Sequence, residues 1–231
     1  MKASIRNSAL AALVLFVQCA ALGWLIWRYE RIVRFGTEVR FRCTAYDPYD
    51  PLRGRYLRTT VREQCSSFIE CSAEDFSSEA RGDFGYRAPN LYAKLEPSTN
   101  GLWCVAAVAE APQSDGGLWV KPRWSRVEHS IGWSDKRKDE SYDAFEKRRD
   151  ASPLVATVGL PDQLFVNERI APEAEKVLQK ATSAKGAGAV AVYRANGGEI
   201  VITDIEIDGK SVTALARESL QASRSGSRVQ D

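Results

Sequence analysis

The chain has 231 residues, of which 32 are Lys or Arg and 30 are Asp or Glu, so its formal net charge is only +2 at pH 7. Because charges of both signs are mixed along the sequence, no basic footprint indicates a nucleic-acid partner and no acidic one indicates a site that collects cations. The part after residue 36 is long enough for one domain with its own hydrophobic core.

Residues 9–27 carry no charged side chain, and Gln18 is the only strongly polar one among them. As an α-helix rising ~1.5 Å per residue, this segment would be about 28 Å long, close to the ~30 Å hydrocarbon core of a bilayer. Trp24 and Trp27 near its end are typical of the membrane–water boundary. We therefore expect residues 1–8 to be a short basic tail, 9–27 an uncleaved transmembrane signal-anchor in contact with the lipid bilayer, and 28–36 a juxtamembrane linker.

Two other interpretations of this segment remain open. A cleaved signal peptide would use the basic residues Lys2 and Arg6 and the weak cleavage triplet Ala21-Leu22-Gly23, but the apolar run continues beyond it. A lipoprotein would use Cys19, although Gln18 before it fits lipidation poorly.

Two features of the sequence disagree about the side of the membrane on which the C-terminal domain lies. Five arginines lie just after the apolar run, which by charge alone favours a cytoplasmic domain (Arg28, Arg31, Arg34, Arg40 and Arg42). A short basic segment before an apolar run is, however, the layout of an export signal, and large domains are translocated despite flanking charge. We expect a single-pass protein of the cell inner membrane with a periplasmic, extracytoplasmic domain.

Four cysteines follow the anchor, at positions 43, 65, 71 and 104. An even number of cysteines suits an oxidising compartment, and four residues allow three disulfide pairings. Cys65 with Cys71 would close a small loop, which leaves Cys43 with Cys104 to join two strands. Zinc is disfavoured because the chain has one histidine, His129, and no CxxC pair. Reduced, buried cysteines are a third alternative.

Most of the remaining sequence has the periodicity of β-strands. In Glu38-Val39-Arg40-Phe41-Arg42-Cys43 the apolar and charged residues alternate, which is typical of a half-buried strand. Further strand-like segments lie at 56–61, 90–96, 102–108, 118–121, 154–158, 189–193 and 200–202. Asn196-Gly197 between the last two predicts a hairpin turn, and the apolar phase shift between Ile202 and Ile205 predicts a β-bulge.

One helix is predicted after Pro172, ending at Gly186 or Gly188. Residues 66–85 and 134–150 are polar enough for surface insertions, and 216–231 are expected to be a disordered tail. The expected fold is mainly β (α+β): an N-terminal transmembrane helix followed by one antiparallel β-rich domain, residues 37–215, carrying one or two helices.

The clearest local motif is Asp47-Pro48-Tyr49-Asp50-Pro51-Leu52-Arg53-Gly54-Arg55-Tyr56. Each proline biases the aspartate before it toward an extended conformation, and Gly54 permits a turn, so the motif is predicted to be a rigid exposed connector between two strands. Its candidate binding residues are Asp47, Pro48, Asp50, Pro51, Arg53, Gly54, Arg55 and Tyr56.

With these residues the chain resembles the GDYXXLXY protein family, single-span membrane proteins without an assigned activity. The segment from Asp47 to Gly54 is similar to the family's DP-x-D-x-x-x-G-D-Y entry. Leu164-Phe165-Val166-Asn167-Glu168 is similar to its later Y-F-V-P-E motif, which adds Glu168 to the candidate site, and the closing Ile205-Glu206-Ile207-Asp208-Gly209 is similar to its usual ending.

The chain departs from the family pattern at three positions: Arg55 replaces an aspartate, Thr59 a leucine and Val61 a tyrosine. If the missing aspartate is functional in the family, this chain has lost or altered that function.

We expect a non-catalytic interaction or assembly domain that binds another envelope or membrane protein, with no cofactor and no metal. An envelope hydrolase is the alternative, using the carboxylates of Asp47, Asp50, Glu168 and Glu173. A ligand-binding domain at the membrane surface is a third possibility, in which four tryptophans would line a groove rather than fill the core (Trp103, Trp119, Trp124 and Trp133).

Overall fold

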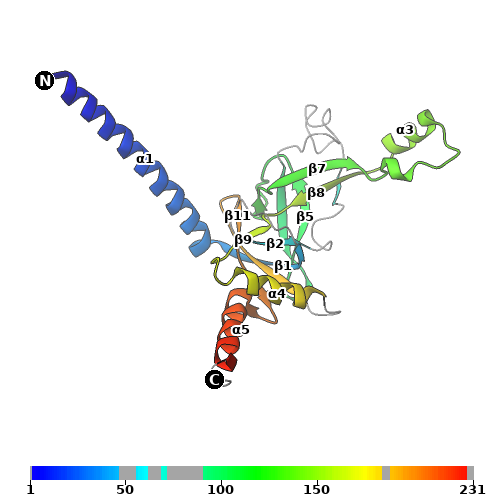
Figure 1. Cartoon of the computed structure of the whole chain (residues 1–231). Coiled ribbons are helices and arrows are strands. Elements are labelled where there is room, and N and C mark those ends of the chain that lie inside the picture. Colours follow the sequence, from blue (N-terminus) through cyan, green and yellow to red (C-terminus); the bar gives the residue numbers. More distant parts are fainter. Residues whose placement is uncertain (1, 47–55, 62–68, 72–90, 184–187, 228–231) are drawn as a thin grey trace.

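A computed structural model of the chain describes residues 2–46, 56–61, 69–71, 91–183 and 188–227 (Figure 1). The α-helices of this part are α1 (Lys2–Phe35), α3 (Tyr142–Asp150), α4 (Ala171–Ser183) and α5 (Val212–Ser227). The strands are β1 (Thr37–Tyr46), β2 (Tyr56–Val61), β3 (Ile69–Cys71), β4 (Tyr92–Pro97), β5 (Trp103–Ala109), β6 (Leu118–Val120), β7 (Trp124–His129), β8 (Leu154–Gly159), β9 (Gln163–Phe165), β10 (Ala189–Asn196), β11 (Glu199–Ile207) and β12 (Lys210–Ser211). All strand pairs are antiparallel, so the expected fold class is confirmed.

α1 is one continuous helix that projects from the domain (Figure 1). Its part Ala12–Phe35 is long and apolar enough to cross a membrane. The helix runs without a break through the predicted boundaries at 8 and 27, which therefore stay predictions. No proline or glycine interrupts 24–35, and Glu30 pairs with Arg34 one turn later at 2.8 Å, so the helix continues to Phe35.

The largest sheet has six strands in the order β12-β11-β10-β1-β2-β9. The β10–β11 hairpin is present, but Asn196 pairs with Glu199, so its turn is Gly197–Gly198, with φ of 60° and 82°. The predicted bulge is confirmed: Val192 pairs with Asp204 and Tyr193 with Ile202, which leaves Thr203 as the extra residue. The sheet curls, since β9 at one edge lies beside β11.

One hydrophobic core joins this sheet to the sheets β3-β8-β7 and β5-β4-β6. Phe41 of β1 and Tyr193 of β10 are both fully buried and pack edge to face, with ring centroids 5.6 Å apart. Leu178 of α4 is buried in the same core, and α4 itself is the helix predicted around Pro172.

The segment 134–150, expected as a surface insertion, contains α3, which stands at the outer end of the long β7–β8 pair (Figure 1). Ser141 caps the start of this helix, because its hydroxyl accepts the Ala144 N–H at 3.2 Å. Phe145 is fully buried within this small unit.

Where the sequence predicted a disordered tail from residue 216, the structure has the helix α5, which runs to Ser227. Val212, Leu215 and Ala216 share one face of this helix; Val212 and Ala216 are fully buried, and Ser219 donates to Glu173 of α4 at 2.7 Å. The domain therefore carries three α-helices in its described part, more than the one or two expected.

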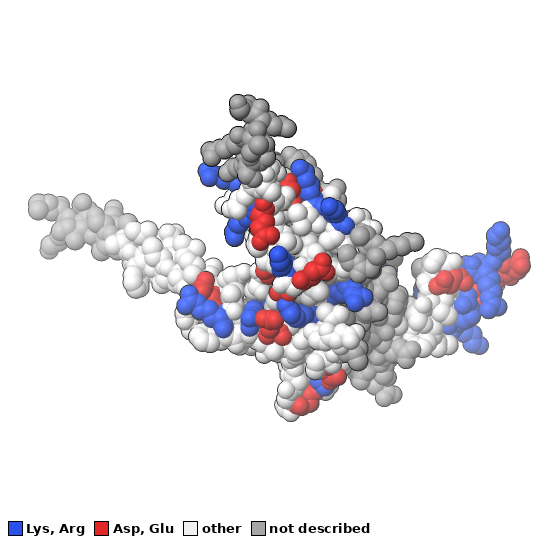
Figure 2. Space-filling view, turned by 90° about the horizontal axis from the view of Figure 1, so that it is seen from below, with Lys and Arg blue, Asp and Glu red and all other residues white. Residues whose placement is uncertain are grey.

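Charges of both signs are interspersed over the face seen in Figure 2. On the outer side of the large sheet they form cross-strand ion pairs, in which Arg40 binds Glu206 and Arg194 binds Glu38.

Candidate functional site at the β2–β9 junction

The two family-like segments of the sequence meet where β2 pairs with β9. Tyr56 lies opposite Phe165, Leu57 opposite Leu164 and Arg58 opposite Gln163. Because side chains alternate along a strand, Leu57 and Leu164 point into the core, 4% and 8% exposed, while Tyr56 and Phe165 lie on the outer face. The remaining motif residues, from Asp47 to Arg55, lie outside the described residues.

Tyr56 and Phe165 form an exposed aromatic pair. Their ring centroids are 6.0 Å apart, and Phe165 is 72% exposed. Tyr56 itself is partly buried and contacts this exposed ring.

A carboxylate beside this pair holds two guanidinium groups. Asp162 binds Nε of Arg58 at 2.7 Å through one oxygen and Arg123 through the other. The backbone here is fixed too, because the Asp162 carbonyl accepts the Thr59 N–H at 2.9 Å and the Pro161 carbonyl accepts the Tyr193 hydroxyl at 2.8 Å. We call Tyr56, Arg58, Arg123 and Phe165 the Tyr56 surface.

The acidic residues of the hydrolase alternative do not assemble into a reactive pair within the described part. Glu168 is exposed in the turn before α4, whereas Glu173 accepts the Ser219 hydroxyl, which lowers the pKa of that carboxyl. Asp47 and Asp50 fall outside the described residues. Within the described residues no group of three or more His, Cys, Asp or Glu side chains is arranged to hold a metal ion.

The cysteine prediction is corrected in part. Cys43 is buried in β1 and Cys104 lies half-buried in β5, and both are free thiols, so they do not form the expected bridge. They belong to different sheets: Cys104 donates to the Glu96 carbonyl at 3.6 Å, while burial raises the pKa of Cys43 to about 12. A Cys65–Cys71 bridge stays a prediction, since Cys65 and the Cys71 side chain are not described.

The tryptophans have different environments. Trp119 is 6% exposed and donates its indole N–H to Asp115 at 2.9 Å, and Trp103 packs against the core. Trp124, by contrast, is 51% exposed. The core interpretation holds for Trp119 and Trp103 and fails for Trp124; the Trp133 side chain is not described.

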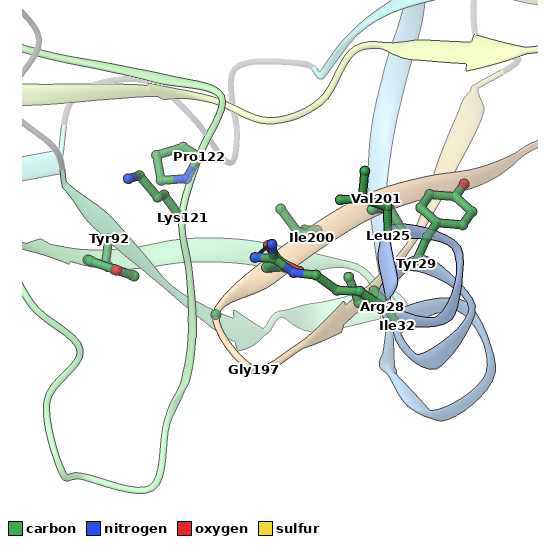
Figure 3. A pocket seen from close by; sticks show the side chains of 12 residues that line it. Leu25, Arg28, Tyr29, Ile32, Tyr92, Lys121, Pro122, Gly197, Ile200 and Val201 are labelled. Atoms are coloured by element: carbon green, nitrogen blue, oxygen red, sulfur yellow. Dashed lines mark hydrogen bonds and ion pairs between the residues drawn. The ribbon is translucent and has the colours of Figure 1, made fainter. Parts of the chain in front are cut away.

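A cavity of about 660 Å³ lies between α1 and the tip of the β10–β11 hairpin (Figure 3). Four helix residues one or two turns apart form one wall: Leu25, Arg28, Tyr29 and Ile32. Arg28 reaches across to Glu199 and donates from Nε at 2.9 Å and also from Nη2. Sequence reasoning missed this cavity because its walls come from segments far apart in the chain, with no shared motif.

Comparison with known proteins decides the family. A family model described as GDYXXLXY protein matches residues 18–205. The chain belongs to the GDYXXLXY family. No curated protein and no solved structure matches it.

The family match in this GDYXXLXY protein begins inside the candidate span and includes both β2 and β9. It ends before α5, so the helix that packs on α4 lies outside the matched region.

Proposed function

We propose that this GDYXXLXY protein is a membrane-anchored, non-catalytic interaction domain that binds another envelope protein through the Tyr56 surface. The observation that carries the proposal is the exposure of Phe165, which leaves 72% of a large apolar side chain in solvent beside Tyr56. Single exposed apolar residues are common, but this one contacts a second aromatic ring, and the strand pair that carries both rings also carries Arg58, which Asp162 holds together with Arg123.

The composition of the Tyr56 surface suits protein recognition. Tyrosine and arginine are enriched among the residues that dominate binding energy at protein interfaces. Arg58 and Arg123 are already oriented by Asp162, so they would lose little side-chain entropy on binding.

The proposed location is the inner membrane, with the domain on the periplasmic side. The basic start before the apolar run supports export, and the candidate span at Ala12–Phe35 supports retention. Alkaline phosphatase fused at the C-terminus is expected to be active, whereas a green fluorescent protein fusion is expected to stay dark. The reverse pattern would contradict the periplasmic location.

The interaction can be tested by placing a photo-crosslinking amino acid at position 165 of the full chain in native membranes. We expect one partner of defined mass to be trapped from position 165 and not from position 142, an exposed aromatic position on α3. Arg58→Glu should abolish the same product. Equal products from both positions, or a product that persists in Arg58→Glu, would refute the proposed surface.

A further inference from the structure

The cavity beside α1 lies where the apolar run of the anchor ends. Leu25 belongs to the uncharged segment, whereas Arg28, Tyr29 and Ile32 follow it within the next two turns. Trp24 and Trp27 are exposed at the same level, and Arg31 lies over the Trp27 ring at 5.2 Å. Exposed tryptophans followed by arginines are typical of the headgroup region, so this cavity opens at the depth of the lipid headgroups.

The wall of the cavity opposite α1 is formed by residues of the β-rich domain. Lys121 and Pro122 come from the connection between β6 and β7, and the Lys121 N–H donates to the Gly198 carbonyl at 2.7 Å. In Figure 3 Lys121 and Tyr92 lie on one side of the hairpin tip and Leu25 and Tyr29 on the other. The hairpin tip itself is Gly197–Gly198.

The side chains that line the cavity carry a net charge of +1. Arg28 and Lys121 are its basic residues and Glu199 is its acidic one. Glu199 is engaged by Arg28, while the exposed Lys121 side chain has no ion pair among the described residues. The lining also contains apolar side chains beside these charges: Leu25, Ile32, Ile200 and Val201.

We propose that this cavity binds an anionic phospholipid of the adjacent leaflet, with the phosphate at Lys121 and the acyl chains along α1 near Leu25. One excess positive charge complements one phosphodiester, and the apolar wall continues into the exposed apolar surface of the anchor. Bound lipid would bridge α1 and the hairpin and hold the domain close to the membrane surface. The proposal requires the membrane anchor and is independent of the Tyr56 surface.

Native mass spectrometry of the full chain in detergent micelles tests this site. Dioleoylphosphatidylglycerol and dioleoylphosphatidylcholine have the same acyl chains and differ in net charge, so they serve as the matched lipid probes. We expect preferential retention of phosphatidylglycerol, and a loss of about fivefold in its affinity for Lys121→Gln, since one basic residue near an anionic lipid contributes about this factor.

Two variants serve as controls. Lys210→Gln removes an exposed lysine on β12, away from the cavity, and should bind phosphatidylglycerol like the unmodified chain. Lys121→Arg keeps the charge and should restore binding.

Three results would overturn the proposal: equal retention of both lipids, equal effects of Lys121→Gln and Lys210→Gln, or displacement of the lipid by an equal concentration of sn-glycerol 3-phosphate. The last result would assign the cavity to a soluble phosphate.

Discussion

Tyr56 and Phe165 occupy directly opposed positions of the antiparallel pair β2–β9, with their rings in contact on the outer face of the sheet. The same register places Leu57 and Leu164 together in the core. One pairing therefore fixes both a buried contact and an exposed aromatic pair. A slip of one residue would exchange the two faces, so the register is strongly specified by burial.

Phe165→Ala should separate binding from stability. Because Phe165 is 72% exposed, we expect its truncation to lower the free energy of unfolding by no more than about 1 kcal/mol, the typical contribution of a cross-strand aromatic pair. Leu164→Ala, one residue away but 8% exposed, should cost ~2–4 kcal/mol. Chemical denaturation of the full chain in micelles measures both. Equal losses in the two variants would contradict the assignment of Phe165 to the surface.

Thr59→Val should stabilise the protein. Thr59 is 1% exposed, and its hydroxyl has no hydrogen-bond partner among the described residues. A buried unsatisfied polar group costs ~1–3 kcal/mol, and valine has nearly the same shape, so we expect a gain of about 1 kcal/mol. Thr44→Val is the control: its hydroxyl donates to the Thr60 carbonyl at 3.4 Å, and the change should be neutral or slightly destabilising. A destabilised Thr59→Val variant would show that the hydroxyl is satisfied.

Gly36→Ala should disrupt the junction between anchor and domain. The Gly36 N–H caps α1 by donating to the Ile32 carbonyl at 2.9 Å, and a Cβ atom here would clash with that carbonyl and lie 3.1 Å from the Ala195 backbone of β10. We expect a loss of ~1–3 kcal/mol in thermal unfolding, as for overpacked core positions. Gly23→Ala, where a Cβ meets nothing within 4 Å, should change stability little. If Gly36→Ala does not lower the stability, α1 and β10 must be able to move apart without a large cost in free energy.

The strands that alternate in sequence were predictable because burial on one face imposes a period of two. β1 is the clear case: Val39, Phe41 and Cys43 are fully or almost fully buried, and the residues between them are charged. The bulge at Thr203 was predictable for the same reason, since the apolar phase changes there. By contrast, α5 is stabilised by packing on α4, which local composition does not encode.

The candidate site was predictable only as separate pieces. Tyr56 and the segment ending at Glu168 stood out singly, but their meeting at β2–β9 depends on a long-range pairing. Asp162 carried no sequence signal, because its role as acceptor for Arg58 and Arg123 exists only after the chain folds. The cavity beside α1 also forms only in the folded chain, since its residues come from α1, β4, the β6–β7 connection and the β10–β11 hairpin.

Cys43 should resist alkylation in the folded protein. The thiolate is the reactive form, and burial raises the pKa of this thiol from 9.0 to about 12, so it is neutral and enclosed at pH 8. Its contribution to stability is present below pH 9 and is lost as the pH rises toward 12, because the unfolded chain then ionises first. Peptide mapping after N-ethylmaleimide treatment should find Cys104 labelled before Cys43, and both labelled in urea. Rapid labelling of Cys43 in the folded state would contradict its burial.

Glu140 lies in the segment between β7 and β8 that contains α3, which we call the β7–β8 arm. Its carboxyl should remain ionised to unusually low pH. Arg148 binds both of its oxygens, at 2.9 and 2.8 Å, and thereby lowers the pKa of Glu140 from 4.5 to about 2. A lowered carboxyl pKa stabilises the folded arm above pH 4.5, and this contribution disappears as the pH falls toward 2. Carbon-13 NMR titration of the Glu140 carboxyl should therefore give a midpoint near 2, with α3 signals shifting in parallel.

The variant Arg148→Gln tests whether Arg148 is the cause of the lowered Glu140 pKa. It removes the guanidinium while leaving the Ser141 cap and the backbone donor Arg137, so the Glu140 midpoint should move up toward 4.5. Arg149→Gln, the neighbouring change, should leave the midpoint in place, because Arg149 pairs with Asp150 at 3.0 Å and not with Glu140. A midpoint near 4.5 in the unmodified protein would mean that the Glu140–Arg148 pair is open in solution. In that case the arm would be ordered by the packing of Phe145 and the Ser141 cap alone.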